Sequence, residues 1–253
     1  MRMQNLLSDD ILQALSEARL STYIKSRECQ IISDPLATYY WNVQLSEALY
    51  PALQALEVVL RNALHNALFH DFRTENWIDL PFLYPKEQEA IRQAKTSLLK
   101  QKKPLEINRI VAELHFGFWT SLFDVRYEHK QTIWPRLLIN IFPNIPKPLR
   151  TRQYLSKQLN RIRRLRNRVF HYEPIWHWHD LKQQHQSIIF LLNWLSPAVA
   201  KHIRKLDRFL EVYDQNFSSN FSSFNNQSYI EVQANKGTEE IMYHIKNVMF
   251  RPY

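Results

Sequence analysis

Basic residues are densest in the segment 161–176, whose sequence is RIRRLRNRVFHYEPIW. At about 100° per residue, apolar side chains spaced three and four apart return to one face of a helix. The apolar positions that cluster in this way are Leu155, Leu159, Ile162, Leu165 and Val169. Arg161, Arg164 and Arg168 fall on the opposite face. That face is either an ordinary solvated surface or a set of guanidinium groups that contact phosphate.

Arg166 differs from these arginines, because the helical wheel places it inside the arc of the leucines. A buried guanidinium is costly unless another group pairs with it. The position therefore predicts a carboxylate partner, a concave site, or a face that meets a second subunit. His171 would point about 140° away from Arg166 on an undisturbed helix. One chain would not easily aim both side chains at a single atom, whereas two chains related by a twofold axis could.

Two polar neighbours of His171 have alternative roles. Asn167 either donates to a phosphate or tunes helix packing. Glu173 either orients His171 or is a carboxylate at the rim of the site, and we favour the rim. Pro174 disfavours helix at Glu173 and predicts that the basic helix has ended by that point.

Glu57 and Arg61 lie earlier in the chain and also have two interpretations. Their spacing is that of an ordinary exposed ion pair on one helix, which is the default. The alternative is that Glu57, at the edge of its apolar stripe, pairs with Arg166 and keeps that side chain oriented.

Metal-binding and aromatic residue types follow the basic helix. His177, His179 and Asp180 do not form an H-E-x-x-H pattern, and the two histidines would point about 160° apart on a helix. We therefore expect no metal site. Trp176 and Trp178 either stack on bases, as aromatic side chains do when proteins recognise single-stranded RNA, or belong to the core.

The composition excludes several classes of phosphate-binding protein. The 253 residues include two glycines, Gly117 and Gly237, which is too few for a P-loop ATPase, a Rossmann enzyme or a glycine-lidded kinase. Scarce glycine also disfavours sandwiches and barrels that are rich in tight turns. The expected fold class is therefore all-α.

Charge and cysteine content indicate the compartment and the kind of partner. The formal net charge is +9, and Cys29 is the single cysteine. One cysteine cannot form an internal disulfide, and it fits a reducing compartment. The segment 1–12 lacks the apolar core of a signal peptide, and the most apolar later run, 187–195, is too short to span a bilayer. We expect a cytoplasmic protein with no membrane association, no cofactor and a polyanionic partner, nucleic acid first.

Helix signals and apolar periodicity predict the elements that position these residues. Ser8 is expected to cap a helix that reaches about Arg27, and Asp34 with Pro35 marks the start of the next helix. We expect Pro51 to interrupt that second helix. The clearest apolar stripe follows at Leu53, Leu56, Leu60, Ala63, Leu64 and Ala67.

Later helices are expected over 85–103, 132–142, 150–170, 180–194 and 198–213. An amphipathic stripe runs from Ile107 to Phe118, and Gly117 within it is expected to allow close approach of another backbone.

These elements divide the chain into three segments. We expect an N-terminal helical segment over 1–33, a helical domain over 34–213, and a polar, Ser/Asn-rich C-terminal extension over 214–253. The end of the extension, 238–250, has the pattern of a short amphipathic helix.

Several segments together resemble the Abi-like (abortive phage infection) family, which belongs to the HEPN superfamily. LRNRVFHYEPIW at 165–176 is similar to the family signature, which is an Arg, a polar residue, a few variable residues and a His. Three further segments resemble the family pattern, namely SEALYPALQALEVVLRNALHNAL at 46–68, ELHFGFWTSLF at 113–123 and WPRLL at 134–138. Together the four segments cover most of 34–195.

The resemblance implies a HEPN-like helical bundle with additional helices, which forms a homodimer so that two Arg and His pairs share one cleft. It also implies a metal-independent endoribonuclease that acts in phage defence or as a toxin. Arg166 would hold the phosphate and stabilise its developing charge, and His171 would move the proton of the ribose 2′-hydroxyl or of the leaving oxygen. The expected products carry a 2′,3′-cyclic phosphate and a 5′-hydroxyl.

The expected site therefore has three groups of residues. The catalytic group is Arg166, His171 and Asn167, the supporting group is Glu57, Arg61 and Glu173, and the RNA-binding group is Arg161, Arg163, Arg164 and Arg168. An antitoxin or a phage-derived trigger is a further expected partner. The alternative function is a catalytically inactive module of the same fold that binds or senses RNA. A third is a domain that binds an anionic surface or another protein.

Overall fold

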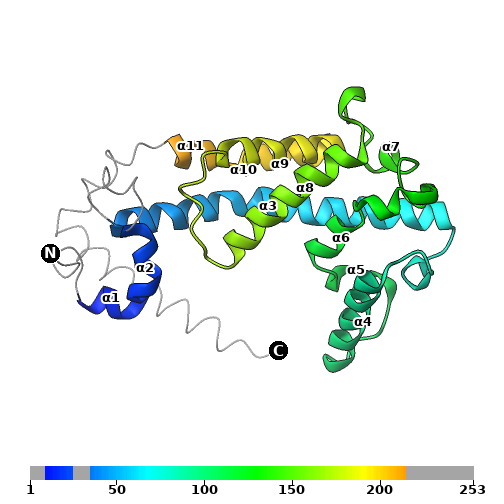
Figure 1. Cartoon of the computed structure of the whole chain (residues 1–253), viewed down its shortest axis with the longest axis horizontal. Coiled ribbons are helices and arrows are strands. Elements are labelled where there is room, and N and C mark those ends of the chain that lie inside the picture. Colours follow the sequence, from blue (N-terminus) through cyan, green and yellow to red (C-terminus); the bar gives the residue numbers. More distant parts are fainter. Residues whose placement is uncertain (1–8, 25–34, 215–253) are drawn as a thin grey trace. The chain divides into compact units, whose positions relative to one another are not determined.

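The structure is a computed structural model that describes residues 9–24 and 35–214. These residues form α-helices and short 3₁₀ helices and include no β-strand (Figure 1). The all-α prediction is thus confirmed for this part of the chain. The described residues fall into two compact units, which comprise 9–24, 35–41 and 211–214 in one and 42–210 in the other. The Ser/Asn-rich extension and the helix expected at 238–250 lie outside the described residues.

The N-terminal helix is divided into α1 (Asp9–Leu15) and α2 (Glu17–Ile24). The prediction of one continuous helix from Ser8 to about Arg27 is therefore wrong. The division falls at Ser16, which has a φ of 66°. The Ser16 hydroxyl accepts a hydrogen bond from the Arg19 amide at 3.3 Å, so it caps the second helix.

α3 runs from Pro35 to Phe72, and its start at Pro35 agrees with the prediction. The expected interruption at Pro51 is wrong, because the helix continues through it. A proline inside a helix removes one hydrogen bond and costs about 3 kcal/mol. Burial of a long apolar stripe on both sides of the proline outweighs this cost. The buried leucines of that stripe include Leu45, Leu49, Leu53, Leu56, Leu60 and Leu64.

The other α-helices follow in chain order. They are α4 (Pro85–Lys100), α5 (Ile107–Glu113), α6 (Phe116–Ser121), α7 (Leu138–Ile141), α8 (Arg152–Phe170), α9 (Leu181–Leu195), α10 (Pro197–Leu206) and α11 (Phe209–Asp214). α8 packs against α6 and α9, and α9 packs against α10 (Figure 1). The predicted helices over 85–103, 150–170 and 180–194 are confirmed to within three residues at each end.

The amphipathic stripe from Ile107 to Phe118 is divided between α5 and α6, because His115 starts a new helix. The Nδ1 atom of His115 accepts a hydrogen bond from the Phe118 amide at 3.2 Å. A Cβ atom on Gly117 would lie 3.0 Å from that nitrogen. Gly117 therefore leaves room for the capping ring, and the expected approach of another backbone at this position is wrong.

The helices expected over 132–142 and 198–213 are also interrupted. Pro135 lacks a backbone N–H and disfavours helix at the residue before it, so the first region keeps only α7. Asp207 separates α10 from α11, and its carboxylate accepts the Phe209 amide at 3.0 Å. A side chain that competes for backbone hydrogen bonds in this way favours a helix end over a helix interior.

Large aromatic side chains fill the core of the unit that comprises 42–210. Trp77, Trp119 and Trp134 are fully buried, and Phe123 stacks on Trp134 with ring centroids 4.5 Å apart. The three indole N–H groups donate to His65 Nδ1 at 3.0 Å, to the Leu114 carbonyl at 3.1 Å and to the Leu122 carbonyl at 2.6 Å. Burial of the rings is therefore not opposed by unpaired indole donors.

Two histidines couple the stability of the fold to pH, the half-buried His65 and the buried His185. Burial lowers the pKa of His65 and of His185 below 6.5 and outweighs Glu75 and Asp207, which raise these pKa values. His65 Nδ1 also accepts the Trp77 indole N–H, so that nitrogen must be unprotonated. Just below pH 6.5 the unfolded chain binds more protons than the folded chain. We therefore expect the free energy of unfolding to fall as the pH decreases from about 6.5.

Urea unfolding between about pH 7.5 and about pH 5.5 measures this dependence. The double variant His65→Gln and His185→Gln removes both groups and should have a shallower slope of unfolding free energy against pH. His202→Gln, at an exposed position of α10, is the control and should keep the wild-type slope. A wild-type slope in the double variant would contradict the prediction.

A buried carboxylate joins α4 to the 3₁₀ helix Val125–Tyr127. Glu87 is 1% exposed and accepts hydrogen bonds from Arg126 Nη2 at 2.7 Å and from the Tyr127 hydroxyl at 2.8 Å. Burial and the hydrogen bond to Glu87 raise the pKa of Tyr127, which keeps the phenol a donor. The Arg126 guanidinium also lies over the Tyr84 ring, with Cζ 4.5 Å from the ring centroid.

We expect Glu87→Ala to lower the free energy of unfolding by about 2 to 3 kcal/mol, because it leaves Arg126 and the Tyr127 hydroxyl without their acceptor. The side chain of Arg126 is 28% exposed, so solvent reduces the loss below that of a fully enclosed pair. Denaturant unfolding measures the change. Glu87→Gln retains an acceptor and should lose less, whereas equal losses in the two variants would contradict this account.

Candidate nucleic-acid interface on helix α8

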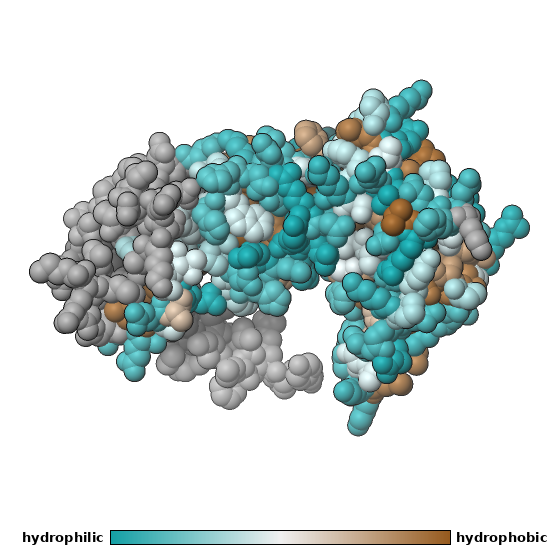
Figure 2. All heavy atoms as spheres, in the orientation of Figure 1, coloured by the Kyte–Doolittle hydropathy of each residue, from teal (hydrophilic) through white to brown (hydrophobic). Residues whose placement is uncertain are grey.

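α8 carries most of the residues that the sequence singles out. Thr151 caps the start of α8, since its hydroxyl accepts a hydrogen bond from the Tyr154 amide at 3.1 Å. The predicted apolar stripe is confirmed, since all five of its members are buried: Leu155, Leu159, Ile162, Leu165 and Val169. The arginines between them are partly or fully exposed. In Figure 2 the surface over α8 and α9 is mostly hydrophilic.

Arg166 pairs with a carboxylate of α3. Its Nε lies 3.2 Å from Glu57 Oε2, and the two side chains are 23% and 20% exposed. The guanidinium also lies over the Phe170 ring, with Cζ 4.2 Å from the centroid. Phe170 in turn stacks on Tyr50, with centroids 5.5 Å apart. Of the three alternatives for Arg166, the carboxylate partner is thus present, and a ring contacts the other side of the guanidinium.

Arg61 is not part of this arrangement. Its Nε donates to Asn62 Oδ1 at 3.2 Å. No ion pair joins Arg61 to Glu57 within residues 9–24 and 35–214. The default interpretation of Glu57 as the partner of Arg61 is therefore wrong, and the alternative pairing with Arg166 is confirmed. Packing of α8 on α3 decides between these two pairings, because it places Arg166 beside the Glu57 carboxylate.

His171 directly follows α8, and its side chain is exposed. The helix ends in the hydrogen-bond pattern of a Schellman motif. The Glu173 amide donates to the Arg168 carbonyl at 2.9 Å, and the Tyr172 amide donates to the Val169 carbonyl at 3.2 Å. Tyr172 has the left-handed φ of 58° that this motif requires. The motif ends the helix before Pro174, as predicted, and leaves the imidazole of His171 accessible at the helix terminus.

The loop after α8 is fastened to α3 by Asn42, which the sequence analysis missed. Asn42 is 3% exposed, and its Oδ1 accepts the amides of Ile175 at 2.7 Å and Trp176 at 3.2 Å. An asparagine inside a long helical pattern gives no sequence signal of such a contact, because its partners lie more than a hundred residues away. Trp176 itself is 7% exposed, so it belongs to the core.

We expect Asn42→Leu to lower the free energy of unfolding by about 2 to 3 kcal/mol. Leucine has a similar volume but no acceptor, so the two buried amides of Ile175 and Trp176 lose their partner. Denaturant unfolding measures the loss. Asn42→Asp keeps an oxygen acceptor and should be less destabilised than Asn42→Leu, and the reverse order would contradict the assigned role.

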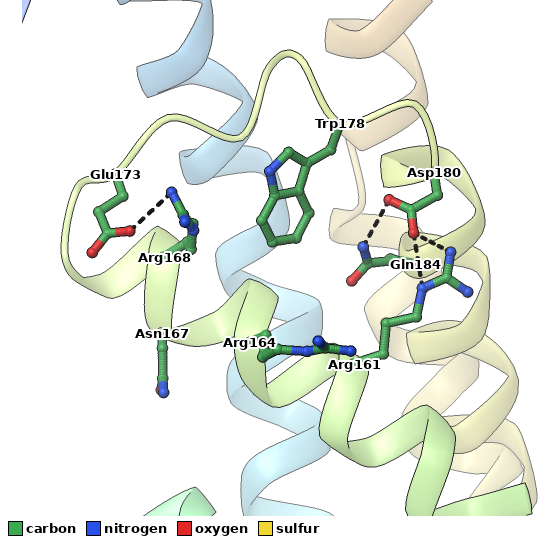
Figure 3. A pocket seen from close by; sticks show the side chains of 8 residues that line it. All are labelled: Arg161, Arg164, Asn167, Arg168, Glu173, Trp178, Asp180 and Gln184. Atoms are coloured by element: carbon green, nitrogen blue, oxygen red, sulfur yellow. Dashed lines mark hydrogen bonds and ion pairs between the residues drawn. The ribbon is translucent and has the colours of Figure 1, made fainter. Parts of the chain in front are cut away.

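A pocket of about 600 Å³ lies beside α8 (Figure 3). Its lining residues are Arg161, Arg164, Asn167, Arg168, Glu173, Trp178, Asp180 and Gln184. In Figure 3 Arg164 extends below the Trp178 ring toward Arg161, with Arg168 on one side and Asp180 on the other. The pocket thus combines three guanidinium groups, two carboxylates and one indole ring.

Carboxylates hold two of the three arginines. Arg161 Nε lies 2.9 Å from Asp180 Oδ2, and Arg168 Nη1 lies 3.1 Å from Glu173 Oε2. Gln184 Nε2 donates to Asp180 Oδ1 at 2.9 Å. Burial raises the pKa of Asp180, but the hydrogen bonds from Gln184 and Arg161 outweigh it and hold that pKa below its ordinary value. Asp180 is therefore ionised near neutral pH and holds Arg161 in place.

The structure separates some residues that the sequence groups together. Arg163 is not among the residues that line the pocket; it lies beside Gly117 of α6, and its Nη2 donates to Asn160 Oδ1 at 3.2 Å. Glu173 pairs with Arg168, and no hydrogen bond links it to His171 in the described part of the chain.

Arg166 and His171 are also apart within one chain. Arg166 packs against α3, His171 is exposed, and no hydrogen bond connects them among the residues that the structure describes. Asn167 lines the pocket with the other α8 arginines instead of sharing the contacts of Arg166. Trp178 and Asp180 also line the pocket. The only indication of this role in the sequence is that an aromatic and an acidic residue follow the basic helix closely.

Among residues 9–24 and 35–214, no three His, Cys, Asp or Glu side chains are placed to hold a metal ion. None of the described helices combines the length and apolar character needed to cross a bilayer. Comparisons of the chain with models of protein families, with curated proteins and with solved structures gave no match.

Proposed function

We propose that this chain is a metal-independent endoribonuclease of the HEPN type and a member of the Abi-like family. Its role would be in phage defence or as a toxin in the cytoplasm, under the control of an antitoxin or a phage-derived trigger. The observation that supports this best is the end of α8, where Arg166 is oriented by Glu57 and Phe170 and His171 is accessible. A fixed guanidinium and an accessible imidazole are the groups that phosphodiester cleavage without metal requires.

In the proposed reaction His171 accepts the proton of a ribose 2′-hydroxyl, and the 2′-oxygen attacks the adjacent phosphorus. The bond from phosphorus to the 5′-oxygen breaks, and the protonated His171 returns its proton to the leaving oxygen. Arg166 donates hydrogen bonds to the nonbridging oxygens and stabilises the charge that builds on them. In this scheme Glu57 is a positioning residue, because it acts through its contact with Arg166.

The proposal requires two copies of the chain. Arg166 and His171 do not contact each other in one chain, since Arg166 is held against α3. A homodimer in which the two α8 termini face each other would supply a guanidinium from one copy and an imidazole from the other to the same phosphate. Such an isologous arrangement is the commonest form of homodimer.

The test is cleavage of RNA by purified full-length protein in EDTA, with chemical identification of the product ends. Products with 2′,3′-cyclic phosphate and 5′-hydroxyl ends, and no cleavage of the DNA of the same sequence, would support the proposal. DNA lacks the attacking hydroxyl, so cleavage of DNA would overturn it, as would a strict requirement for a divalent metal. Sedimentation of the same sample measures the expected dimer.

A second candidate function is a catalytically silent module that binds or senses RNA. The basic pocket with Trp178 favours it, because cations and an aromatic ring are the usual means of binding single strands. This module would bind RNA with an affinity that falls as salt rises and would leave the strand intact. Binding without cleavage at any protein concentration, in the presence of cell extract from infected cells, would favour it over the nuclease.

A further inference from the structure

We propose that the pocket beside α8 holds one unpaired nucleotide unit, with its phosphate on Arg164 and its base against Trp178. The proposal rests on the proposed function, which implies that the nucleotide belongs to an RNA strand. A free nucleotide has the same chemistry and is the second possible source. The pocket is distinct from the arrangement around Arg166, which is not among its lining residues.

The phosphate position follows from the charges in the pocket. Arg161 is bound by Asp180 and Arg168 by Glu173. Arg164 is exposed, and no hydrogen bond or ion pair engages its guanidinium within the described ranges 9–24 and 35–214. Two carboxylates therefore balance two of the three arginines, and the donors of Arg164 remain open. A guanidinium with open donors binds a phosphate through two parallel hydrogen bonds.

The carboxylates also hold the lining side chains of the pocket in place. Asp180 receives hydrogen bonds from both Arg161 and Gln184, so it fixes one wall. Glu173 fixes Arg168 on the other wall, where the Arg168 Cζ lies 5.8 Å from the centroid of the Trp178 ring. Because these side chains are already held, a ligand would lose less conformational freedom of the site on binding.

Trp178 supplies the base position. Its half-buried ring lines the same pocket as Arg164 and lies above it in Figure 3. An indole offers a flat surface on which any base can stack. The pocket volume of about 600 Å³ lies within the usual range for small-molecule sites, so it can enclose a nucleotide. A base inside a duplex is stacked on both faces, so the pocket selects an unpaired nucleotide.

The joint presence of the ring and the open guanidinium argues against other polyanions. Inorganic phosphate and an acidic peptide would use the arginines and leave the indole without a role. A nucleotide uses both features at once, because its phosphate and its base lie at opposite ends of one unit. RNA as a single strand presents such units repeatedly and at a fixed spacing.

The test is a binding titration of the full-length chain in the His171→Ala background, so that RNA is not consumed. The probes are a fluorescent single-stranded oligoadenylate, the same strand in a duplex, adenosine monophosphate and inorganic phosphate. We expect Arg164→Gln and Trp178→Ala each to weaken binding of the single strand about 10-fold, and Trp178→Phe to weaken it less. Lys157→Gln is the matched control, since it removes one positive charge from an exposed position of α8 outside the pocket.

The outcomes distinguish an RNA strand from a free nucleotide as the ligand, and they test the pocket proposal separately from the nuclease proposal. Competition by adenosine monophosphate that Trp178→Ala abolishes would assign the pocket to a free nucleotide, and binding of the single strand alone would assign it to RNA. Equal binding of single strand and duplex would overturn the proposal that the pocket holds an unpaired nucleotide. Unchanged affinity in both Arg164→Gln and Trp178→Ala would also overturn it. If Arg164→Gln and Trp178→Ala lose binding but the chain with His171 intact never cleaves RNA, the pocket proposal holds and the nuclease proposal fails. If the chain with His171 intact cleaves RNA but the two substitutions leave binding unchanged, the nuclease proposal holds and the pocket proposal fails.

Discussion

We expect His171→Ala to lower the rate of RNA cleavage by about 10²- to 10⁴-fold, the usual loss when a general acid or base is removed. His171 lies beyond the last residue of α8 and its side chain is exposed. Its backbone amide donates to the Asn167 carbonyl at 2.9 Å, and alanine retains this bond. The substitution should therefore change the chemistry without unfolding the helix end. Single-turnover cleavage in EDTA, wild type beside variant, measures the rate.

RNA binding by the same variant should stay close to that of the wild type, because the pocket beside α8 does not include His171. The matched control is His202→Ala, at an exposed position of α10, which should keep the wild-type rate. Cleavage at the wild-type rate by His171→Ala would remove this histidine from the mechanism. A rate loss accompanied by a lower melting temperature would assign the effect to folding, and His171→Gln, which retains a polar side chain, should then recover activity.

We expect Arg166→Gln to lower the cleavage rate by about 10²- to 10³-fold, since one preorganised donor to a developing anion has about this value. Arg166→Lys should also be impaired, because an ammonium keeps the charge but lacks the planar pair of donors. Glu57→Gln should have a smaller effect, about 10-fold, because it loosens the orientation of Arg166 and leaves its charge. Single-turnover rates, with thermal unfolding of each variant, test the order of these effects.

Mixing the two inactive variants tests whether the site is shared between copies. In a dimer of one Arg166→Gln chain and one His171→Ala chain, one chain still provides Arg166 and the other still provides His171. Co-refolded mixtures should therefore recover part of the wild-type rate if the pair acts across the interface. No recovery in a mixture that sediments as a mixed dimer would show that the two side chains act within one chain.

The sequence already indicates which faces of the helices are buried. The 3.6-residue period of the leucines on α3 and α8 is a local property, and it correctly identified the buried stripes and the exposed arginines. The starts of helices at Pro35 and Pro85 were equally local, because proline suits the first turn of a helix. The anomalous position of Arg166 on its wheel was also visible. It indicated a carboxylate partner, a concave site or a second subunit without deciding among them, and Glu57 was one candidate partner.

The failures of sequence reasoning occurred where non-local packing or a single side-chain hydrogen bond decided the outcome. Pro51 does not end α3, because burial on both sides of it exceeds the local cost. Three side chains divide predicted helices by accepting hydrogen bonds from nearby backbone amides, namely those of Ser16, His115 and Asp207. Such bonds compete with the helix by small energies that periodicity does not measure.

The sequence is sufficient to predict the all-α class, the basic face of α8 and the anomalous position of Arg166. Three contacts become evident when the helices are packed. Arg166 pairs with Glu57, Asn42 holds the loop after His171, and Trp178 joins Arg164 in a pocket that Arg163 does not line. The physical reason is the range of the interactions. Helical faces follow from neighbours three and four residues apart, whereas these contacts depend on how separate helices and loops pack against one another.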